Sequence, residues 1–208
     1  RLLELFDATP GAVLIGTQMI AKGLDFPDVT LVGVINADTM LKLPDFRAAE
    51  RTFDLLEQVA GRAGRGEKPG KVIIQSYWST HPAIASVVTH DRRPFLDAEL
   101  KERREGAYPP FSRLSNVLFW GASEKEVRRV ADQMAEALHA KLDLQSGWEI
   151  LGPADCVKAK VKDKYRRHFL VKAPVDAQVG EILSECAASL DKRVGINMTL
   201  DVDAYDMM

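Results

Sequence analysis

The sequence lacks several features that define large classes of protein. It has no apolar run close to the roughly 20 residues of a membrane-spanning helix, which excludes a transmembrane segment. Its only cysteines, Cys156 and Cys186, are widely spaced and form no metal-ligand cluster, so we expect two reduced thiols in a cytoplasmic protein. It also contains neither a G-x-x-x-x-G-K-[ST] phosphate loop nor a D-E-x-H-type magnesium box. We therefore expect no ATP hydrolysis by this chain alone.

The composition is that of a folded globular chain. Hydrophobic residues make up 46% of the 208 residues, and the net charge is −2 with both signs well mixed. This length accommodates one large domain or two small ones. The chain begins at Arg1 inside a helical pattern, without methionine or signal peptide, so we expect a piece of a longer protein.

The most informative segment runs from Gln58 to Arg65 and reads QVAGRAGR. It places Arg62 and Arg65 three residues apart at the end of an amphipathic helical pattern. An arginine offers a planar, permanently charged fork that suits the oxygens of a phosphate. Glycines at 61 and 64 allow the backbone to approach such a ligand closely. A solvated basic helix end would explain the charges but not the glycines or the glutamine.

A second motif lies upstream, where the apolar residues 12–15 lead into GTQMIAKGLDFP at 16–27. A short apolar run bounded by turn residues predicts a buried parallel strand. The motif then leaves the carboxyl end of that strand, where open α/β sheets bind their ligands. Taken alone, this segment fits a simple loop equally well.

Together the two segments resemble motifs V and VI of superfamily 2 helicases. Further segments are similar to one branch, the bacterial primosomal replication-restart helicases (the primosomal protein N′, or PriA, family). These segments are Asp38, the run PDFRAAERTF at 44–53, the run YPPF at 108–111 and the run LGP at 151–153. The resemblance extends over the whole chain.

The resemblance implies roles for particular residues. Arg62 and Arg65 would be the catalytic arginines, facing the departing phosphate of ATP. Gln58, Gly23 and Asp25 would contact the nucleotide, and Thr17, Gln18 and Lys22 would contact DNA. ATP and Mg²⁺ would bind in a site completed by a first helicase lobe that this chain lacks. The zinc module of the family precedes motif V and is absent here, so we expect no structural zinc and assign no residue as a metal ligand. Arg47, Glu50 and Arg51 would lie near the nucleotide or the lobe interface, but spacing alone assigns them no role.

The implied activity is that of the carboxyl-terminal part of an ATP-dependent 3′–5′ DNA helicase. Its family recognises stalled or abandoned replication forks and contacts single-strand-binding protein and primosome-loading proteins. No membrane is expected among the partners. Two alternatives are another superfamily 2 fork-remodelling translocase and a non-catalytic nucleic-acid-binding module with vestigial motifs. Neither the preferred fork structure, the partner surfaces nor the oligomeric state follows from the sequence.

The chain is expected to be α/β, with a partial RecA-like second helicase lobe in residues 1–80. This lobe would hold parallel strands at about 12–16, 29–35 and 71–75 and a helix at 46–60. Its missing opening strands would leave a sheet edge or an apolar face poorly covered. Residues 81–111 predict a helical connector that ends at the paired prolines. Within this connector, one helix would carry Ile84, Val87 and Val88 on one face, and a second helix would hold Phe95, Leu96 and Leu100.

Residues 112–208 predict a separate α+β domain. Strands are expected at 114–120, near 148–151, on both sides of a turn at 162–164, and at 197–202. Helices are expected from Ser123, a capping residue with Glu126 at the capping-box position, to about 142, and at 176–190. This order is that of a split βαβ, ferredoxin-like fold, similar to the ribosomal-S10-like tail of the family.

The tail domain also carries six cations within ten residues: Lys158, Lys160, Lys162, Lys164, Arg166 and Arg167. Because residues two apart share a face of a strand, most of these charges are expected on one side of a hairpin, unless the turn breaks the register. Such a ribbon suits a nucleic-acid backbone, with Tyr165 available to stack on a base. The alternative is an edge strand that lysines protect from aggregation.

Overall fold

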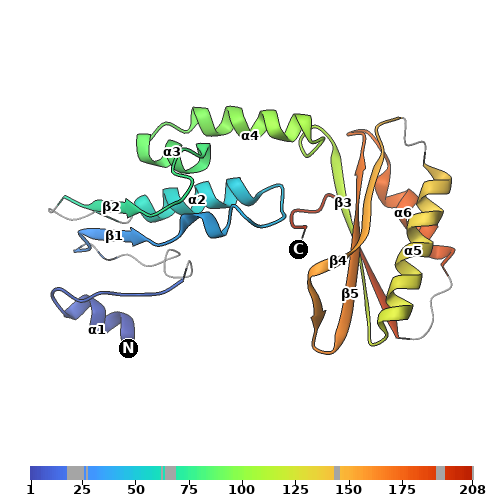
Figure 1. Cartoon of the computed structure of the whole chain (residues 1–208), viewed down its shortest axis with the longest axis horizontal. Coiled ribbons are helices and arrows are strands. Elements are labelled where there is room, and N and C mark those ends of the chain that lie inside the picture. Colours follow the sequence, from blue (N-terminus) through green and yellow to red (C-terminus); the bar gives the residue numbers. More distant parts are fainter. Residues whose placement is uncertain are drawn as a thin grey trace. The chain divides into compact units, whose positions relative to one another are not determined.

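The computed structural model describes residues 1–17, 26, 28–61, 63, 69–142, 146–190 and 195–207 (Figure 1). The chain forms two compact units, Arg1–Glu99 and Leu100–Met208, and the division falls within the helix α4. The domain boundaries expected at 80 and 111 stay a prediction.

The first unit contains a parallel pair of short strands. Its elements in chain order are α1 Leu2–Ala8, β1 Leu31–Val34, η2 Ala37–Thr39, α2 Ala48–Ala60, β2 Lys71–Ile74, α3 Pro82–Thr89 and α4 Arg93–Glu105. Strand β1 pairs with β2 in parallel, and Leu31 lies opposite Lys71. The parallel pairing expected of a helicase lobe is therefore confirmed for these two strands.

The strand predicted at 12–16 is wrong. These residues form no strand, and the side chains of Val13 and Ile15 are 82% and 87% exposed. An apolar run becomes a buried strand only when a neighbouring strand accepts its backbone hydrogen bonds. Among the residues that the structure describes, no strand pairs with this segment.

The core of the first unit lies between α2 and the helices α3 and α4. Phe53 of α2 stacks on Phe95 of α4 with ring centroids 4.4 Å apart, and Leu56 and Ile84 are buried beside them. In α3 the side chains of Ile84 and Val87 are buried and that of Val88 is exposed, and in α4 Phe95 is buried whereas Leu96 and Leu100 are exposed. His90, in the left-handed conformation, ends α3, so α4 begins in a new orientation that the helical period of α3 does not predict.

One face of the β1–β2 pair is poorly covered, as the missing strands led us to expect. Val34 and Ile74 point toward the core, whereas Leu31 and Ile73 are 59% and 49% exposed on the opposite face. Since side chains alternate across a strand, Leu31 and Ile73 lie on the face opposite the one that packs against the core of Phe53, Leu56 and Ile84.

The second unit is an antiparallel sheet with two helices. Its elements are β3 Arg113–Gly121, α5 Glu124–Lys141, β4 Glu149–Val161, β5 Lys164–Ala173, α6 Val179–Ala188 and β6 Ile196–Asp201. The strand order is β4-β5-β3-β6, and every neighbouring pair is antiparallel. This is the split βαβ arrangement that the sequence predicted. The strand expected near 148–151 and the first hairpin strand are one element, β4, which shifts register between Leu151 and Ala154.

Local sequence explains how this unit is built. The hydroxyl oxygen of Ser123 accepts a hydrogen bond from the Glu126 amide, which caps α5 as predicted. Both helices cover the same face of the sheet in Figure 1, and Met134 and Leu138 of α5 are buried in the core. At Gly121 a Cβ atom would lie 2.8 Å from the Gly195 carbonyl oxygen, so close pairing of β3 with β6 requires glycine.

Within the described part of the chain, no helix is long and apolar enough to cross a membrane.

The packing of the second unit predicts which side chains lower the stability of the fold when they are replaced by alanine. Phe169 of β5 is 1% exposed and faces the two helices. We expect Phe169→Ala to lower the free energy of unfolding by about 3–5 kcal/mol, because it leaves a cavity in this core. Urea unfolding followed by Trp148 fluorescence, in a variant with no other tryptophan, measures this loss. Val175→Ala, at a 61% exposed position, should change stability by less than about 0.5 kcal/mol, and equal losses would contradict this account of the core.

Candidate functional site

A buried carboxylate organises the carboxyl ends of β1 and β2. Asp38 lies in η2, directly after β1, and is fully buried. Its oxygens accept hydrogen bonds from the Ser76 hydroxyl at 2.7 Å, the Tyr77 amide at 2.9 Å and the Trp78 amide at 3.2 Å. These three donors all follow β2. Asp38 therefore ties together the two segments that leave the sheet at the edge where open α/β sheets bind ligands.

The same contacts set the charge state of Asp38. Burial raises its pKa, but hydrogen bonds from Tyr77, Ser76 and Trp78 outweigh burial and hold the pKa below its ordinary value. The side chain is thus ionised at neutral pH, and its charge is matched by donors of the protein itself.

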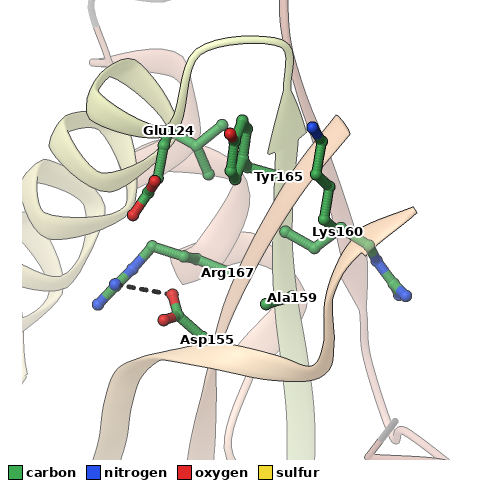
Figure 2. Close-up of a pocket in the computed structure, with 8 residues that line it drawn as sticks. Glu124, Asp155, Ala159, Lys160, Tyr165 and Arg167 are labelled. Carbon is green, nitrogen blue, oxygen red and sulfur yellow. Dashed lines mark hydrogen bonds and ion pairs between the residues drawn. The ribbon is translucent and has the colours of Figure 1, made fainter. Parts of the chain in front are cut away.

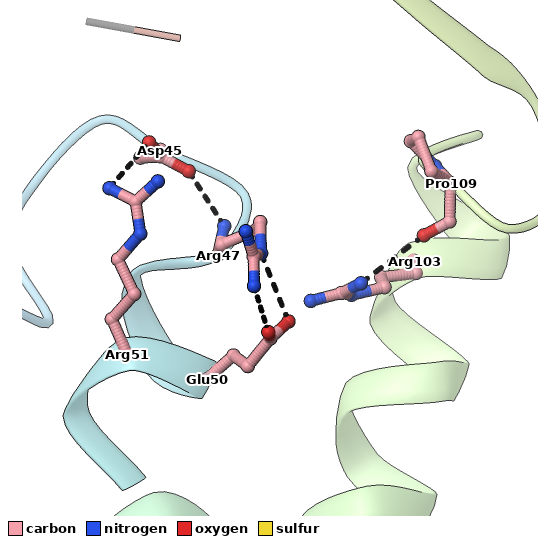
Figure 3. A network of polar contacts seen from close by, with 6 residues as sticks. All are labelled: Asp45, Arg47, Glu50, Arg51, Arg103 and Pro109. Carbon is pink, nitrogen blue, oxygen red and sulfur yellow. Dashed lines mark hydrogen bonds and ion pairs between the residues drawn. The ribbon is translucent and has the colours of Figure 1, made fainter. Parts of the chain in front are cut away.

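A network of ion pairs fixes the start of α2 (Figure 3). The Asp45 carboxylate accepts a hydrogen bond from the Arg47 amide at 2.9 Å and pairs with Arg51 at 3.2 Å. Arg47 in turn pairs with Glu50 through its guanidinium. Asp45 and Arg47 are both buried. The network thus gives Arg47, Glu50 and Arg51 a structural role in anchoring α2, which the sequence did not assign.

Helix α2 carries Gln58 and ends at Gly61, which donates its amide to the Glu57 carbonyl. Gln58 is partly exposed in the last turn of α2, and Thr17, near the start of motif V, is exposed. The other motif residues expected to bind nucleotide or DNA lie outside the described residues: Gln18, Lys22, Gly23, Asp25, Arg62 and Arg65.

The cationic segment forms the β4–β5 hairpin, but its charges do not share one face. Lys162 and Asp163 both have positive φ and make a two-residue turn, and Val161 pairs with Lys164. The next pair is Lys160 with Tyr165. At the tip, Lys160 therefore shares a face with Tyr165, on the helix side of the sheet, whereas Lys164 alternates to the other face. The register of β4 shifts between Lys160 and Asp155, so the pairing at the tip does not extend to Asp155 and Arg167.

The six cationic side chains also differ in their exposure and in the groups that they contact. Lys158, Lys162 and Lys164 are exposed. Lys160 pairs with Asp163 at 3.4 Å and lies over the Tyr165 ring. Arg167 is mostly buried and pairs with Asp155 at 3.0 Å (Figure 2). Its guanidinium also donates to the Pro153 carbonyl at 2.8 Å. The tip of the hairpin is thus its most accessible positive part.

Tyr165 faces the interior. It packs against the core beneath the helices and lines a cavity of about 180 Å³ between α5 and the hairpin (Figure 2). Three cations, Lys160, Arg166 and Arg167, line the same cavity together with the carboxylates of Glu124 and Asp155. A base would have to displace these contacts to reach the tyrosine ring, which makes Tyr165 a poor stacking platform.

The two cysteines are free, buried thiols, and burial raises the pKa of each. Among the described residues, no group of three or more His, Cys, Asp or Glu side chains is arranged to hold a metal ion.

The buried position of Asp38 gives its contribution to stability a definite pH dependence. A pKa below the unfolded value of 3.8 means that ionised Asp38 stabilises the fold at neutral pH, and that this contribution disappears as pH falls through the folded pKa. We expect Asp38→Asn to lower the urea midpoint at about pH 7 and to lower it less below about pH 3. Trp78 fluorescence reports the transition once Trp120 and Trp148 are replaced by phenylalanine. Asp97→Asn, at an exposed position of α4, is the control, and an equal loss at both pH values would contradict the role of the charge.

Comparison with known proteins places the whole chain within one family. A model of the "Helicase conserved C-terminal domain" matches residues 1–67, and a model of the "Primosomal protein N C-terminal domain" matches residues 104–205. The replication restart protein PriA of Bacillus subtilis is 42% identical over 212 residues, which cover 100% of this chain and 26% of that protein.

Two further relatives of the same name match this chain at similar identity. The protein of the same name from Treponema pallidum is 42% identical over 210 residues, covering 100% of this chain and 31% of that protein. The Synechocystis protein is 44% identical over 173 residues, or 83% of this chain and 21% of its own length. The chain thus spans between a fifth and a third of the length of these relatives. It belongs to the family of the replication restart protein PriA and matches the carboxyl-terminal part of that family.

Proposed function

We propose that this chain is the carboxyl-terminal part of an ATP-dependent DNA helicase that unwinds DNA from 3′ to 5′ at stalled or abandoned replication forks. The observation that carries this proposal is the order and spacing of the two helicase motifs in a chain of the PriA family. The proposed site of action is the cytoplasm, where bacterial DNA is replicated.

In this proposal, Arg62 and Arg65 stabilise the negative charge that develops on the departing phosphate of ATP. Gln58, Gly23 and Asp25 contact the nucleotide from the same lobe. ATP and Mg²⁺ bind in a cleft that a first helicase lobe completes, because this sequence has no phosphate loop. The buried ion pairs at the start of α2 and the core packing of Phe53 and Leu56 support the proposal, since both hold the helix that leads into the arginine motif.

DNA is proposed to contact two parts of the chain. Thr17, Gln18 and Lys22 bind its backbone beside the nucleotide site. In the tail, Lys158, Lys162 and Lys164 at the hairpin tip bind phosphates, and Lys160 and Arg166 lie next to them. Arg167 contributes to the local positive field but has its own partners in Asp155 and Pro153.

The remaining partners are proposed from the family: single-strand-binding protein and the proteins that load the primosome. A fork-remodelling translocase of another superfamily 2 branch would not be expected to carry the tail domain matched at 104–205. A non-catalytic nucleic-acid-binding module would require the arginine motif to be inactive. Substitution of Arg62 and Arg65, described next, separates that function from a catalytic one.

Substitution of the motif arginines tests the catalytic proposal. In the full-length protein, we expect Arg62→Ala or Arg65→Ala to lower kcat for DNA-stimulated ATP hydrolysis by about 100-fold or more, the scale of arginine fingers. DNA affinity without nucleotide should stay near normal. Arg93→Ala, at an exposed position of α4, serves as the control. An unchanged kcat in both motif variants would show that these arginines are structural.

The hairpin proposal predicts a salt effect. Replacing Lys158, Lys162 and Lys164 with glutamine should flatten the slope of log K against log salt by about two to three units, since each phosphate contact contributes roughly 0.7–0.9. Fluorescence anisotropy with a labelled forked oligonucleotide, titrated with salt, measures this slope.

The control for the hairpin variant removes the same net charge elsewhere. Lys71, Lys101 and Lys125 are exposed on β2, α4 and α5, and their replacement by glutamine should leave the slope within about half a unit. If lysines only protect the edge strand, the hairpin variant will keep the parent slope and will aggregate where the parent chain stays dispersed, as light scattering would show.

A further inference from the structure

Two aromatic side chains are exposed next to each other at the carboxyl edge of the first unit's sheet. Tyr77 and Trp78 follow β2 by three and four residues, and their side chains are 83% and 50% exposed. Tyrosine and tryptophan carry large apolar surfaces that are usually covered in a folded protein. Their exposure at a ligand-binding edge therefore needs an explanation beyond the fold.

The backbone beneath the two rings is held by several hydrogen bonds. Both amides donate to Asp38, and the Trp78 amide also lies 2.9 Å from the Ser76 hydroxyl oxygen. On the other side, the Trp78 carbonyl accepts from the His81 amide at 2.9 Å. A ligand that stacks on these rings would order little additional backbone, which lowers the entropic cost of binding.

The surroundings of the rings are polar and positive. The Lys42 ammonium lies over Trp78, 5.6 Å from the ring centroid. The nearest residues in the chain, Ser76, Ser79 and Thr80, carry hydroxyl groups. A protein-docking patch is apolar at its centre, whereas an aromatic ring beside a cation suits a nucleotide unit, with a base for the ring and a phosphate for the ammonium.

We propose that Tyr77 and Trp78 form a base-stacking contact for single-stranded nucleic acid, and that Lys42 binds the adjoining backbone phosphate. Asp38 acts as a positioning residue that holds the two rings at the edge of the sheet. This contact rests on the proposed DNA-binding function, but it lies in a different unit from the β4–β5 hairpin and involves none of its residues. A single strand fits better than a duplex, because its bases are free to leave their own stack.

Tryptophan fluorescence tests the contact in the 208-residue chain. Replacing Trp120 and Trp148 with phenylalanine leaves Trp78 as the only tryptophan, and an oligothymidylate should then quench its emission in a saturable way. Tyr77→Ala should weaken this binding by about 5-fold or more, the lower end for one stacked base. Lys42→Gln should flatten the salt slope by about 0.7, the value for one phosphate of a single strand. Asp38→Asn should weaken binding and leave the salt slope unchanged, since Lys42 is still present.

Two controls separate local contact from general effects. A chain whose only tryptophan is Trp148, which packs against the tail core, should show no quenching. Tyr205→Ala removes another exposed tyrosine, 69% accessible, and should leave the affinity unchanged.

The outcomes distinguish this contact from the proposed function. Oligonucleotide binding by anisotropy without quenching of Trp78 overturns the stacking contact and leaves the hairpin proposal standing. Absence of any binding overturns both. Equal quenching by ATP alone, or by a duplex of the same length, would assign the rings to a free nucleotide or a duplex surface and would also overturn the inference.

Discussion

The carboxylate of Asp38 is the interaction on which the candidate site of the first unit depends. Two parallel strands of four residues each offer few backbone hydrogen bonds, and beyond them the Ala37 amide donates to the Gln75 carbonyl at 3.0 Å. Asp38 joins the segments that follow the two strands through three hydrogen bonds from within the protein. Because the carboxylate is buried and fully engaged, it can organise the edge without binding a ligand itself.

A second constraint governs the tail. The two-residue turn at Lys162 and Asp163, together with a register shift between Lys160 and Asp155, sets which faces of β4 and β5 coincide. Lys160 lies on the helix side and Lys164 on the other. On the helix side of the sheet, Tyr165 packs against the core and Arg167 pairs with Asp155. The positive charge that remains accessible is concentrated at the tip, which is the geometry of a ribbon that follows a phosphate backbone rather than of a platform for bases.

Periodic patterns predicted much of the fold. The capped helix from Ser123 and the strand order of the tail followed from local signals, since each apolar face has one place to be buried. The strand expected at 12–16 failed because its pairing depends on a neighbour that local sequence does not contain.

The sequence predicted some residues of the candidate site and missed others. The helicase motifs and the hairpin cations are visible in the sequence because they combine unusual residue types at fixed spacing. The roles of Asp38 and Arg47 were not, because their partners at Ser76–Trp78 and Glu50 are defined only by the fold. The sequence likewise did not predict that the Tyr165 ring packs against the core whereas the Trp78 ring is exposed. Which side of a sheet or loop a ring occupies depends on the fold, and the spacing of apolar residues does not determine it.

The central claim is that this chain contacts DNA through defined surfaces in both units. Hydrogen–deuterium exchange of the chain, with and without a forked oligonucleotide bearing a single-stranded arm, tests it most directly. The account predicts slower exchange on binding at two places, the amides of Ser79 and Thr80 beside the exposed rings and the amides of the hairpin tip around Lys162, with little change in α5. Uniform protection across both units, or none at either place, would contradict it.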